Sequence, residues 1–280
     1  MKYALFGINI GPCADPDNMR AVAIAAEQAG FESVWTGEHV VLPDPQEPPS
    51  PAPPLTDMVH PSTALSYLAA VTSTLKLATG ITLLAQRNAL VLAKEMASLD
   101  FLSKGRLIFG IGAGYLKSEF DALGVEFSER GSRTDEYIDA MREVWSSNTP
   151  SYSGKFVRYE GIQSRPQPVQ NGGPEIVIGG ASKAAFRRAV TKCSGWYGFA
   201  MNHETAADAI TGLQEAADKY ERPAELGDLE ISITPLGRTS PADVEKWSEM
   251  GVSRLILLQP GQDQSSLVAY VNDVANELFR

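Results

Sequence analysis

The sequence predicts an α/β fold, a closed (β/α)8 or TIM barrel, from three observations. Short apolar runs of strand length alternate with amphipathic stretches of helix length along the whole chain. The strand-like runs number eight, and each is followed by a helical pattern, as parallel crossovers require. Their uniformly apolar character indicates a sheet covered on both faces. We expect one domain over residues 1–280, with an open doubly wound sheet as the alternative.

The predicted strands are rich in β-branched, aliphatic and aromatic residues, which suit a buried pleated surface. In chain order they are 3–10, 33–37, 76–84, 106–114, 175–180, 195–201, 230–236 and 254–259.

The predicted helices show apolar periodicity and, in places, terminal signals. Asp15 and Pro16 predict the start of the first helix, and Gly30 its end. Ser240 and Pro241 mark another start. The helical segments are 17–30, 62–74, 90–103, 134–145, 182–192, 205–220, 242–251 and 266–279.

Two insertions interrupt this alternation, one after the second strand and one after the fourth. Residues 40–61 hold eight of the 18 prolines, which predicts a long loop. The 60 residues between the fourth and fifth strands include a hairpin pattern around Ser153 and Gly154. Loops of this length in a compact domain typically cover or line a site.

Composition excludes several classes of partner and site. The net charge of −10 would repel nucleic acid. Cys13 and Cys193 indicate neither a disulfide framework nor a zinc site, so we expect no metal and a reducing cytoplasm. No apolar run is long enough to span a bilayer, so no membrane partner is expected.

Glu38 and His39 end the second predicted strand, and active sites of parallel barrels lie at the C-terminal strand ends. An imidazole exchanges protons near neutral pH, and a carboxylate can orient a neighbour. Adjacent strand residues face opposite sides, so the two side chains need not touch. His39 is either functional or a hydrogen-bonded structural histidine. Glu38 is either functional or part of a buried ion pair with an arginine from another strand.

Glycines end the fourth predicted strand in "GIGAGY", residues 110–115. They would let the backbone approach a flat ligand, or they form only a tight turn. The GxGxG spacing after a fourth strand lacks the initial βαβ frame of a dinucleotide site, so an NAD enzyme is a remote alternative. Trp35, Tyr115 and Trp196 are core residues or cofactor walls.

The fifth predicted strand ends in "IVIGGAS", which opens a helix at Ser182. Free amides and the helix dipole there suit a phosphate, although simple loop geometry would leave the same pattern. We expect Arg187 and Arg188 in that helix to be surface charges. Gly80 interrupts the third strand and indicates a bulge or a close backbone approach. His60 and His203 receive no role.

The chain resembles the luciferase-like monooxygenase superfamily, the bacterial-luciferase-type barrels that bind flavin or deazaflavin. The resemblance is carried by "AEQAGFESVWTGEHVVLP", "ATGITLL" and "LAKEMASLDFLSKGRLIFGIGAGYLKSEFDALGVEFSERG". Within the superfamily, it is most similar to the probable coenzyme F-420-dependent oxidoreductases, whose members carry the same G-E-H-V-V-x-P after the second strand.

The resemblance implies a role for each motif. It places Glu38 and His39 near the reactive edge of the ring, and a non-proline cis peptide that backs the ring at Gly80 and Ile81. The loop beside the ring and the phosphate site would comprise Gly112, Ala113, Gly114, Tyr115, Gly179, Gly180, Ala181 and Ser182. In TIM barrels generally, a phosphate site more often lies after the seventh and eighth strands.

The resemblance implies hydride transfer between coenzyme F-420, an 8-hydroxy-5-deazaflavin, and a small organic substrate. One alternative is a two-component monooxygenase that uses reduced FMN from a flavin reductase. Another is a non-catalytic flavin-binding or structural barrel. Relatives also imply a homodimer, for which residues 92–102 could supply a face.

Overall fold

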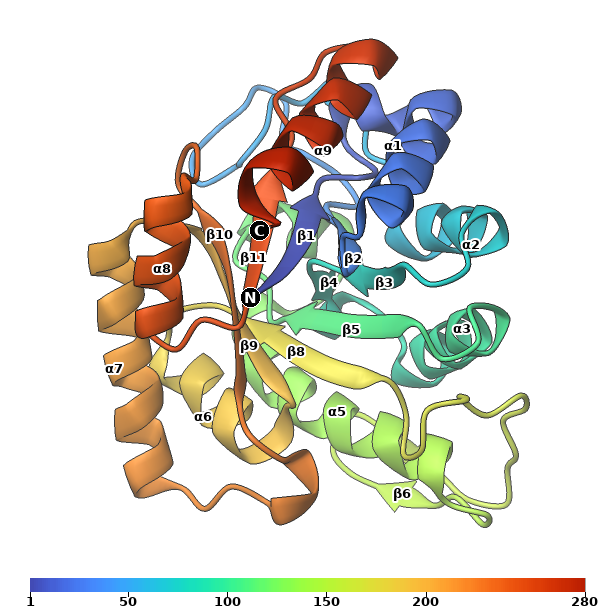
Figure 1. Cartoon of the computed structure of the whole chain (residues 1–280). Helices are drawn as coiled ribbons and strands as arrows, with labels where there is room; N and C mark the ends of the chain where they lie inside the picture. The colour runs from blue at the N-terminus through green and yellow to red at the C-terminus, as the bar shows by residue number, and fades with distance from the viewer. Residues whose placement is uncertain (280) are drawn as a thin grey trace.

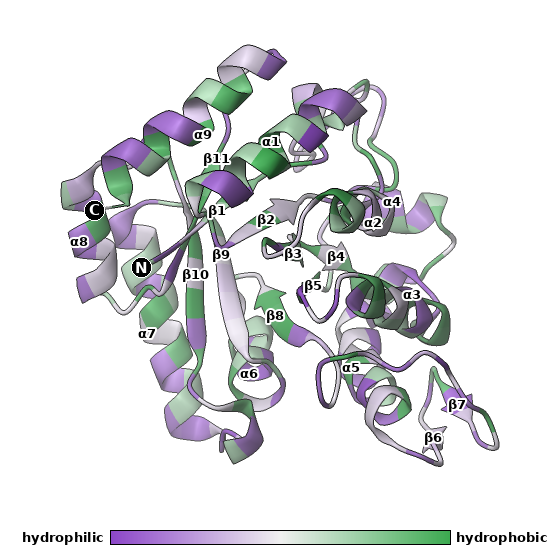
Figure 2. Cartoon of the chain, turned by 45° about the vertical axis from the view of Figure 1, so that its right-hand side comes forward, coloured by the Kyte–Doolittle hydropathy of each residue, from purple (hydrophilic) through white to green (hydrophobic). Residues whose placement is uncertain are grey.

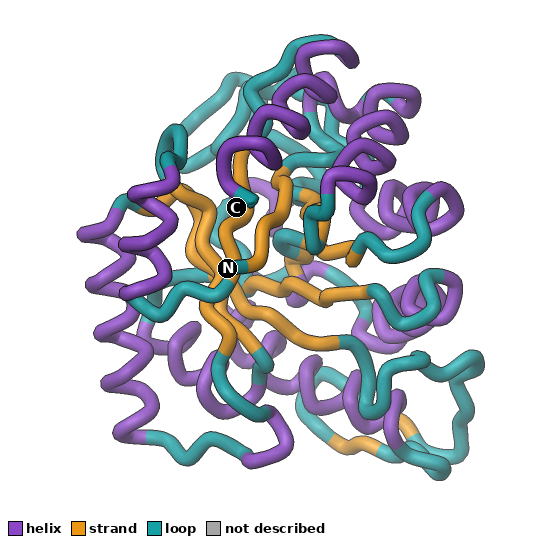
Figure 3. The backbone as a smooth tube through the Cα atoms, viewed as in Figure 1, coloured by secondary structure: helices purple, strands orange, loops and turns teal. Residues whose placement is uncertain are grey.

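The computed structural model describes residues 1–279 and forms a closed parallel barrel (Figures 1 and 3). The strands are β1 Lys2–Phe6, β2 Ser33–Thr36, β3 Lys76–Thr79, β4 Thr82–Leu83, β5 Leu107–Gly112, β8 Glu175–Gly179, β9 Gly195–Met201, β10 Glu230–Pro235 and β11 Arg254–Leu258. Their order is β3-β2-β1-β11-β10-β9-β8-β5-β4, and an additional β3–β5 pairing closes the sheet. Because β3 and β4 are two parts of one predicted strand, the eightfold barrel is confirmed. The open sheet is excluded.

The helices surround the strands as an outer layer (Figure 3). They are α1 Pro16–Ala29, α2 Pro61–Val71, α3 Ala89–Leu102, α4 Lys117–Ala122, α5 Arg130–Ser146, α6 Lys183–Lys192, α7 His203–Lys219, α8 Pro241–Glu249 and α9 Gln264–Leu278. Short 3-10 turns are η1 Gly11–Ala14, η2 Leu84–Gln86, η3 Phe127–Glu129 and η4 Ala224–Leu226. None of the helices within residues 1–279 has the length and apolarity to cross a bilayer.

The predicted helix ends of α1 are confirmed. The Asp15 side chain accepts hydrogen bonds from the amides of Asp17 and Asn18, which satisfies donors that a helix leaves free. Gly30 ends the helix with a φ of 89°. That left-handed conformation favours glycine.

Three elements differ from the predictions. The first strand stops at Phe6 because Gly7 adopts a φ of 80°. Gly80 and Ile81 break the third strand into β3 and β4. The fourth-strand insertion contains the unpredicted helix α4 before α5. Its hairpin is confirmed as antiparallel β6 Tyr152–Ser153 and β7 Arg158–Tyr159.

A compact layer of apolar side chains fills the barrel interior. In Figure 2 hydrophobic and hydrophilic residues alternate along the outer helices, as expected for helices that pack one face on the strands. The layer takes one side chain from each of seven strands: Ala4, Trp35, Ala78, Ile108, Val177, Tyr197 and Ile256. Trp35 and Trp196 are fully buried, so both are core residues rather than cofactor walls. The chain termini lie close together, where Tyr3 stacks on Phe279 (Figure 1).

An ion cluster around the buried Arg254 closes the N-terminal end of the barrel. Arg254, whose side chain is 1% exposed, lies 2.9 Å from Glu32 and 3.0 Å from Glu230. It also donates to the Ser232 hydroxyl. Burial raises the pKa of Glu32, but hydrogen bonding and charge from Arg254 outweigh this effect and leave the pKa below its usual value. We call Arg254, Glu32 and Glu230 the lower ion cluster.

Candidate active site

The proline-rich loop begins and ends at the C-terminal mouth of the barrel, and Asn9 holds its two ends together. The fully buried Asn9 amide group donates to the carbonyl oxygens of Gly37 and Val59 and accepts from the Gly37 amide. One side chain from the loop after β1 therefore fixes the base of the second-strand insertion. The sequence analysis did not single out Asn9.

Glu38 is buried in an ion pair, which was one of its two predicted alternatives. Its carboxylate pairs with the Arg87 guanidinium and accepts a hydrogen bond from the Leu83 amide at 3.1 Å. Arg87 follows η2 rather than lying within a strand. Both carboxylate oxygens are thus occupied by protein donors, which fixes Glu38 beside β4.

His60 belongs to the same network, although no role was predicted for it. The Arg87 Nη2 atom lies 2.8 Å from His60 Nε2, and Ser62 Oγ lies 3.0 Å from His60 Nδ1. Because a guanidinium only donates, Nε2 must accept, so the Nδ1 proton faces Ser62. Glu38, Arg87 and His60 therefore tie the start of the loop to its end.

His39 contacts Glu119 and Tyr115, which sequence reasoning did not connect with it. The imidazole Nδ1 atom lies 3.2 Å from a Glu119 carboxylate oxygen, and Nε2 lies 3.3 Å from the Tyr115 hydroxyl. The other Glu119 oxygen accepts the Val40 amide. The Glu119 side chain is 0% exposed and that of His39 is 8% exposed. Glu119 lies on α4, the short helix absent from the predictions.

The protonation pattern of this trio follows from its environment. Burial raises the pKa of Glu119, but hydrogen bonds from His39 and the Val40 amide help to outweigh this effect, and the pKa lies below its usual value. Burial and the Glu119 charge raise the pKa of Tyr115. An ionised Glu119 can only accept, so His39 carries its proton on Nδ1. Tyr115 then donates to Nε2, the basic nitrogen at the mouth.

Ile81 lies where the ends of β3, β5 and β8 meet. The Gly80–Ile81 peptide bond is cis, as the resemblance implied. A Cβ atom at Gly112 would collide with the Ile81 side chain, and one at Gly179 would lie 2.6 Å from its Cδ1 atom. These glycines therefore make room for Ile81 itself. These contacts and the His39–Tyr115 contact bring the C-terminal ends of β2, β3, β5 and β8 together at one mouth.

The loop after β8 presents a more open helix start than those after the last three strands. Gly180, Ala181 and Ser182 are exposed, and Ser182 caps α6 with one bond to the Ala185 amide. Full capping boxes instead occupy the starts of α7, α8 and α9, through Asn202–Thr205, Ser240–Asp243 and Asp263–Ser266. The last two boxes place carboxylates where a phosphate would need positive potential.

Arg188 is not the surface charge that the sequence suggested. It is only 5% exposed, and both Arg187 and Arg188 pair with Asp135 on α5. The prediction failed because α5 packs on α6 and supplies a carboxylate. Both guanidinium groups are therefore engaged away from the mouth.

Buried polar atoms without protein partners also lie near the mouth. Thr36 Oγ1 ends β2, and both polar atoms of the Gln86 amide are buried in η2. Gln86 is near enough to Glu119 to lower its pKa, but its geometry falls short of a hydrogen bond. Such groups are the kind that a polar ligand edge or a water satisfies.

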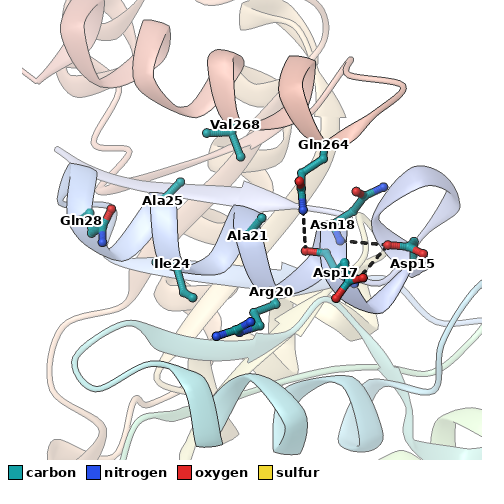
Figure 4. A pocket seen from close by; sticks show the side chains of 10 residues that line it. All are labelled: Asp15, Asp17, Asn18, Arg20, Ala21, Ile24, Ala25, Gln28, Gln264 and Val268. Atoms are coloured by element: carbon teal, nitrogen blue, oxygen red, sulfur yellow. Dashed lines mark hydrogen bonds between the residues drawn. The ribbon is translucent and has the colours of Figure 1, made fainter.

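Two surface hollows lie elsewhere and contain none of the predicted site residues. One, of about 820 Å³, runs between α1 and α9 and is lined by residues such as Arg20, Gln28 and Gln264 (Figure 4). The other lies beside η1 and Met58. Within residues 1–279, no group of three or more His, Cys, Asp or Glu side chains could hold a metal ion. The titratable residues described above, Glu38, His39, Tyr115 and Glu119, therefore lie at the mouth of the barrel and line neither hollow.

Comparisons with known proteins agree with this architecture. A family model described as luciferase-like monooxygenase matches residues 5–273. The chain is 30% identical to an FMNH(2)-dependent dimethylsulfone monooxygenase of Pseudomonas fluorescens (strain Pf0-1), over 86% of this chain and 62% of that one. It is 27% identical to an F420-dependent glucose-6-phosphate dehydrogenase of Amycolatopsis mediterranei (strain U-32), over 73% and 61%. An F420-dependent secondary alcohol dehydrogenase structure aligns with a TM-score of 0.80 at 15% identity, over 99% of this chain and 98% of that one.

Proposed function

The chain belongs to the luciferase-like monooxygenase family, and from this premise we propose that it is a coenzyme F-420-dependent oxidoreductase. The observation that carries the proposal is the basic Nε2 atom of His39, held at the mouth by Glu119 through Nδ1. When bound, a deazaflavin supplies the ring carbon that exchanges a hydride with the substrate. A neighbouring group must then exchange the accompanying proton. His39 is placed to do so.

Each mouth residue takes a role that its contacts support. When the substrate is an alcohol and is oxidised, its hydroxyl group would replace the Tyr115 hydroxyl as the hydrogen-bond partner of His39 Nε2. His39 Nε2 would then accept the hydroxyl proton. Ionised Glu119 stabilises the imidazolium that forms, as a buried carboxylate does for a catalytic histidine. Glu38 is engaged by Arg87, so we assign it support of the loop and of the local charge rather than proton transfer.

The ring and the phosphate would occupy two adjoining parts of the mouth. Ile81 and residues 112–115 would contact the ring face and its edge. The amides of Ala181 to Lys183 at the open start of α6 would hold the phosphate. The capped starts of α8 and α9 explain why this chain would depart from the common phosphate position of barrels.

An FMNH2-dependent monooxygenase, served by a flavin reductase, is the second candidate. The 30% identity to the dimethylsulfone monooxygenase favours it. The two cofactors share a tricyclic ring and a ribityl phosphate, so the same mouth contacts apply. Oxygen uptake that requires both reduced FMN and substrate would support this candidate over the first.

Parallel fluorescence titrations with coenzyme F-420 and FMN test the proposal. We expect saturable binding of one mole of F-420 per chain, and weaker binding of FMN. Ala181→Glu, which adds a negative charge at the start of α6, should weaken the binding about tenfold or more. Ser265→Glu adds the same charge at the start of α9 and serves as the matched control. If neither ring bound, a non-catalytic barrel would replace the proposal.

We also propose a homodimer through α3. Besides its buried face, this helix exposes Val91, Phe101 and Leu102 to solvent, and apolar surface of this kind commonly marks an interface. Sedimentation should give a dimer at micromolar concentration, and Leu102→Glu should shift it to monomer. A monomeric wild-type protein would contradict the assignment.

A further inference from the structure

The mouth has a second half, across the barrel from the charged cluster, and a β-bulge shapes it. Ile233 pairs with Gly198 and Pro235 pairs with Met201, so β9 advances three residues while β10 advances two. Within the bulge, Ala200 adopts a φ of 53°. Such a conformation is uncommon for a residue with a Cβ atom, and bulges beside active sites typically redirect a side chain.

The residue that the bulge presents is Phe199. Tyr197, two positions earlier, lies in the layer that fills the barrel, so Phe199 extends from the same side above it. Its ring centroid lies 5.0 Å from that of Phe6 and 6.4 Å from that of Tyr197. Nevertheless, 51% of Phe199 is exposed. A large aromatic side chain is thus held at the mouth without being covered.

Phe6 connects Phe199 to the charged half of the mouth. A Cβ atom at Gly37 would lie 3.3 Å from the tip of the Phe6 ring. Gly37 directly precedes Glu38 and His39. The aromatic pair therefore forms a continuous apolar floor that reaches the start of the catalytic segment.

Two leucines extend this floor along the neighbouring strands. Leu236 is 65% exposed and Leu258 is 41% exposed. Thr234 on β10 and Ile256 on β11 face the barrel interior. Leu236 and Leu258 each lie two positions further along, so they extend from the same side of their strands. We call Phe199, Leu236 and Leu258 the apolar arc.

The loops around the apolar arc offer no free cation. Segments 7–15, 202, 236–240 and 259–263 contain one lysine or arginine, Arg238. Arg238 pairs with Glu277 on α9 at 2.8 Å. The three helix starts on this side are already capped by their own side chains. A phosphate, sulfonate or carboxylate placed here would find no charge-assisted donor to replace its water.

We propose that the apolar arc binds the apolar body of an uncharged organic substrate, with Phe199 as the residue that selects it. This inference rests on the proposed function, because the substrate must present its reacting carbon beside the ring and His39. The bulge and its left-handed Ala200 hold the Phe199 ring over the mouth. The charged half handles the proton, and the uncharged half recognises the substrate.

Binding of matched probes to the cofactor-loaded protein tests the proposal. Acetophenone and 4-carboxyacetophenone differ by one carboxylate, and glucose 6-phosphate is a polar anion. We expect acetophenone to perturb the absorption spectrum of the bound ring at the lowest concentration, and the two anions to need at least tenfold more. Preferential binding of either anion would overturn the proposal.

Variants separate the apolar arc from general effects on the fold. Phe199→Ala should weaken acetophenone binding about tenfold, whereas Phe199→Leu should retain most of it and both should keep wild-type cofactor affinity. Val169→Ala truncates an apolar side chain that is 55% exposed beside Gly105, at the other end of the barrel, and should change nothing. Unchanged acetophenone binding in Phe199→Ala would sink the inference. If the wild-type protein bound neither coenzyme F-420 nor FMN, the proposed function itself would be wrong.

Discussion

The two ends of the barrel both bury charged side chains, but they use them differently. At the N-terminal end, each of the three side-chain nitrogens of Arg254 contacts Glu32, Glu230 or Ser232. At the C-terminal mouth, Glu119 fixes one nitrogen of His39, while the other contacts only Tyr115, which is 49% exposed. Burial and charge therefore do not identify a functional cluster. What distinguishes the mouth is a histidine at a C-terminal strand end whose second nitrogen contacts a half-exposed tyrosine, and on this difference we base the proposed site.

The largest expected effect is on turnover at the mouth. His39→Ala should lower kcat by about 10²- to 10⁴-fold, because proton exchange at a positioned histidine contributes that much. The Tm should fall by only a few degrees, since Glu119 loses the His39 contact but keeps the hydrogen bond from the Val40 amide. Steady-state kinetics beside thermal unfolding measures both. Wild-type turnover in His39→Ala would end its assignment as the proton-exchanging group.

The opposite result is expected at the lower ion cluster. Arg254→Met should destabilise the fold by about 1 to 3 kcal/mol, because the partly buried carboxylates of Glu32 and Glu230 would lose the hydrogen bonds from Arg254 and keep only Lys76 and Lys2 as partners. Cofactor affinity of the folded fraction should stay at the wild-type level. Denaturant unfolding gives the first quantity and fluorescence titration the second. A stable Arg254→Met protein with lost cofactor binding would reverse the division between the two ends.

Glu119 should behave as a positioning residue between these extremes. Glu119→Gln leaves the shape but loses the charge that holds the proton on His39 Nδ1, so kcat should fall about 10²-fold. The cofactor Kd should remain within about twofold, and Glu119→Asp should recover part of the rate. If the acidic limb of the pH–rate profile did not move in Glu119→Gln, the coupling to His39 would be absent.

Acid should lower the stability of the fold by protonating one glutamate at each end of the barrel. The folded pKa values of Glu32 and Glu119 lie below their ordinary value of 4.5. Their stabilisation is fully present above that value and is lost as the pH falls through the folded pKa values. The Tm should therefore be nearly flat from about pH 7 to 5 and fall below about pH 4.5. Glu32→Gln and Glu119→Gln should each flatten part of this fall, and an unchanged slope in both would contradict the pKa directions.

The smallest effect concerns backbone strain at the mouth. Ala200→Gly should stabilise the fold by about 0.5 to 1 kcal/mol, because glycine adopts the left-handed conformation freely. Lys104→Gly, at a φ of 60° in the turn before β5, is the matched control and should give a similar gain. Only Ala200→Gly should also weaken acetophenone binding, since it loosens Phe199. If both variants bound acetophenone with equal affinity, the left-handed conformation of Ala200 would have no part in substrate recognition.

The alternation of apolar runs and helices was enough to predict the barrel, because every strand is buried on both faces and each is followed by a crossover helix. His39 could be placed for the same reason, as the end of a strand has a fixed location in a barrel. Glu119 could not, because it lies 80 residues further along in an insertion and resembles its solvated acidic neighbours. The buried helix face marked by Phe120 was the available signal.

Arg87 and His60 escaped prediction for a related reason. Their partners depend on how the proline-rich loop folds back on the β4–α3 connection, and no periodic pattern encodes that path. The glycines of "GIGAGY" end a strand as expected, but the space beside them is already filled: by the Thr79 carbonyl at Gly110, by Ile81 at Gly112 and by Phe120 at Gly114. Whether a glycine leaves room for a ligand depends on which side chains of neighbouring strands pack against it. The pattern of apolar and polar residues along the sequence does not specify that packing.

A crystal structure of the protein with coenzyme F-420 tests the central claim most directly. The account predicts that the ring contacts Ile81 and lies beside His39, with the phosphate at the amides of residues 181–183. A ring bound in the groove between α1 and α9, or at the lower ion cluster, would contradict it.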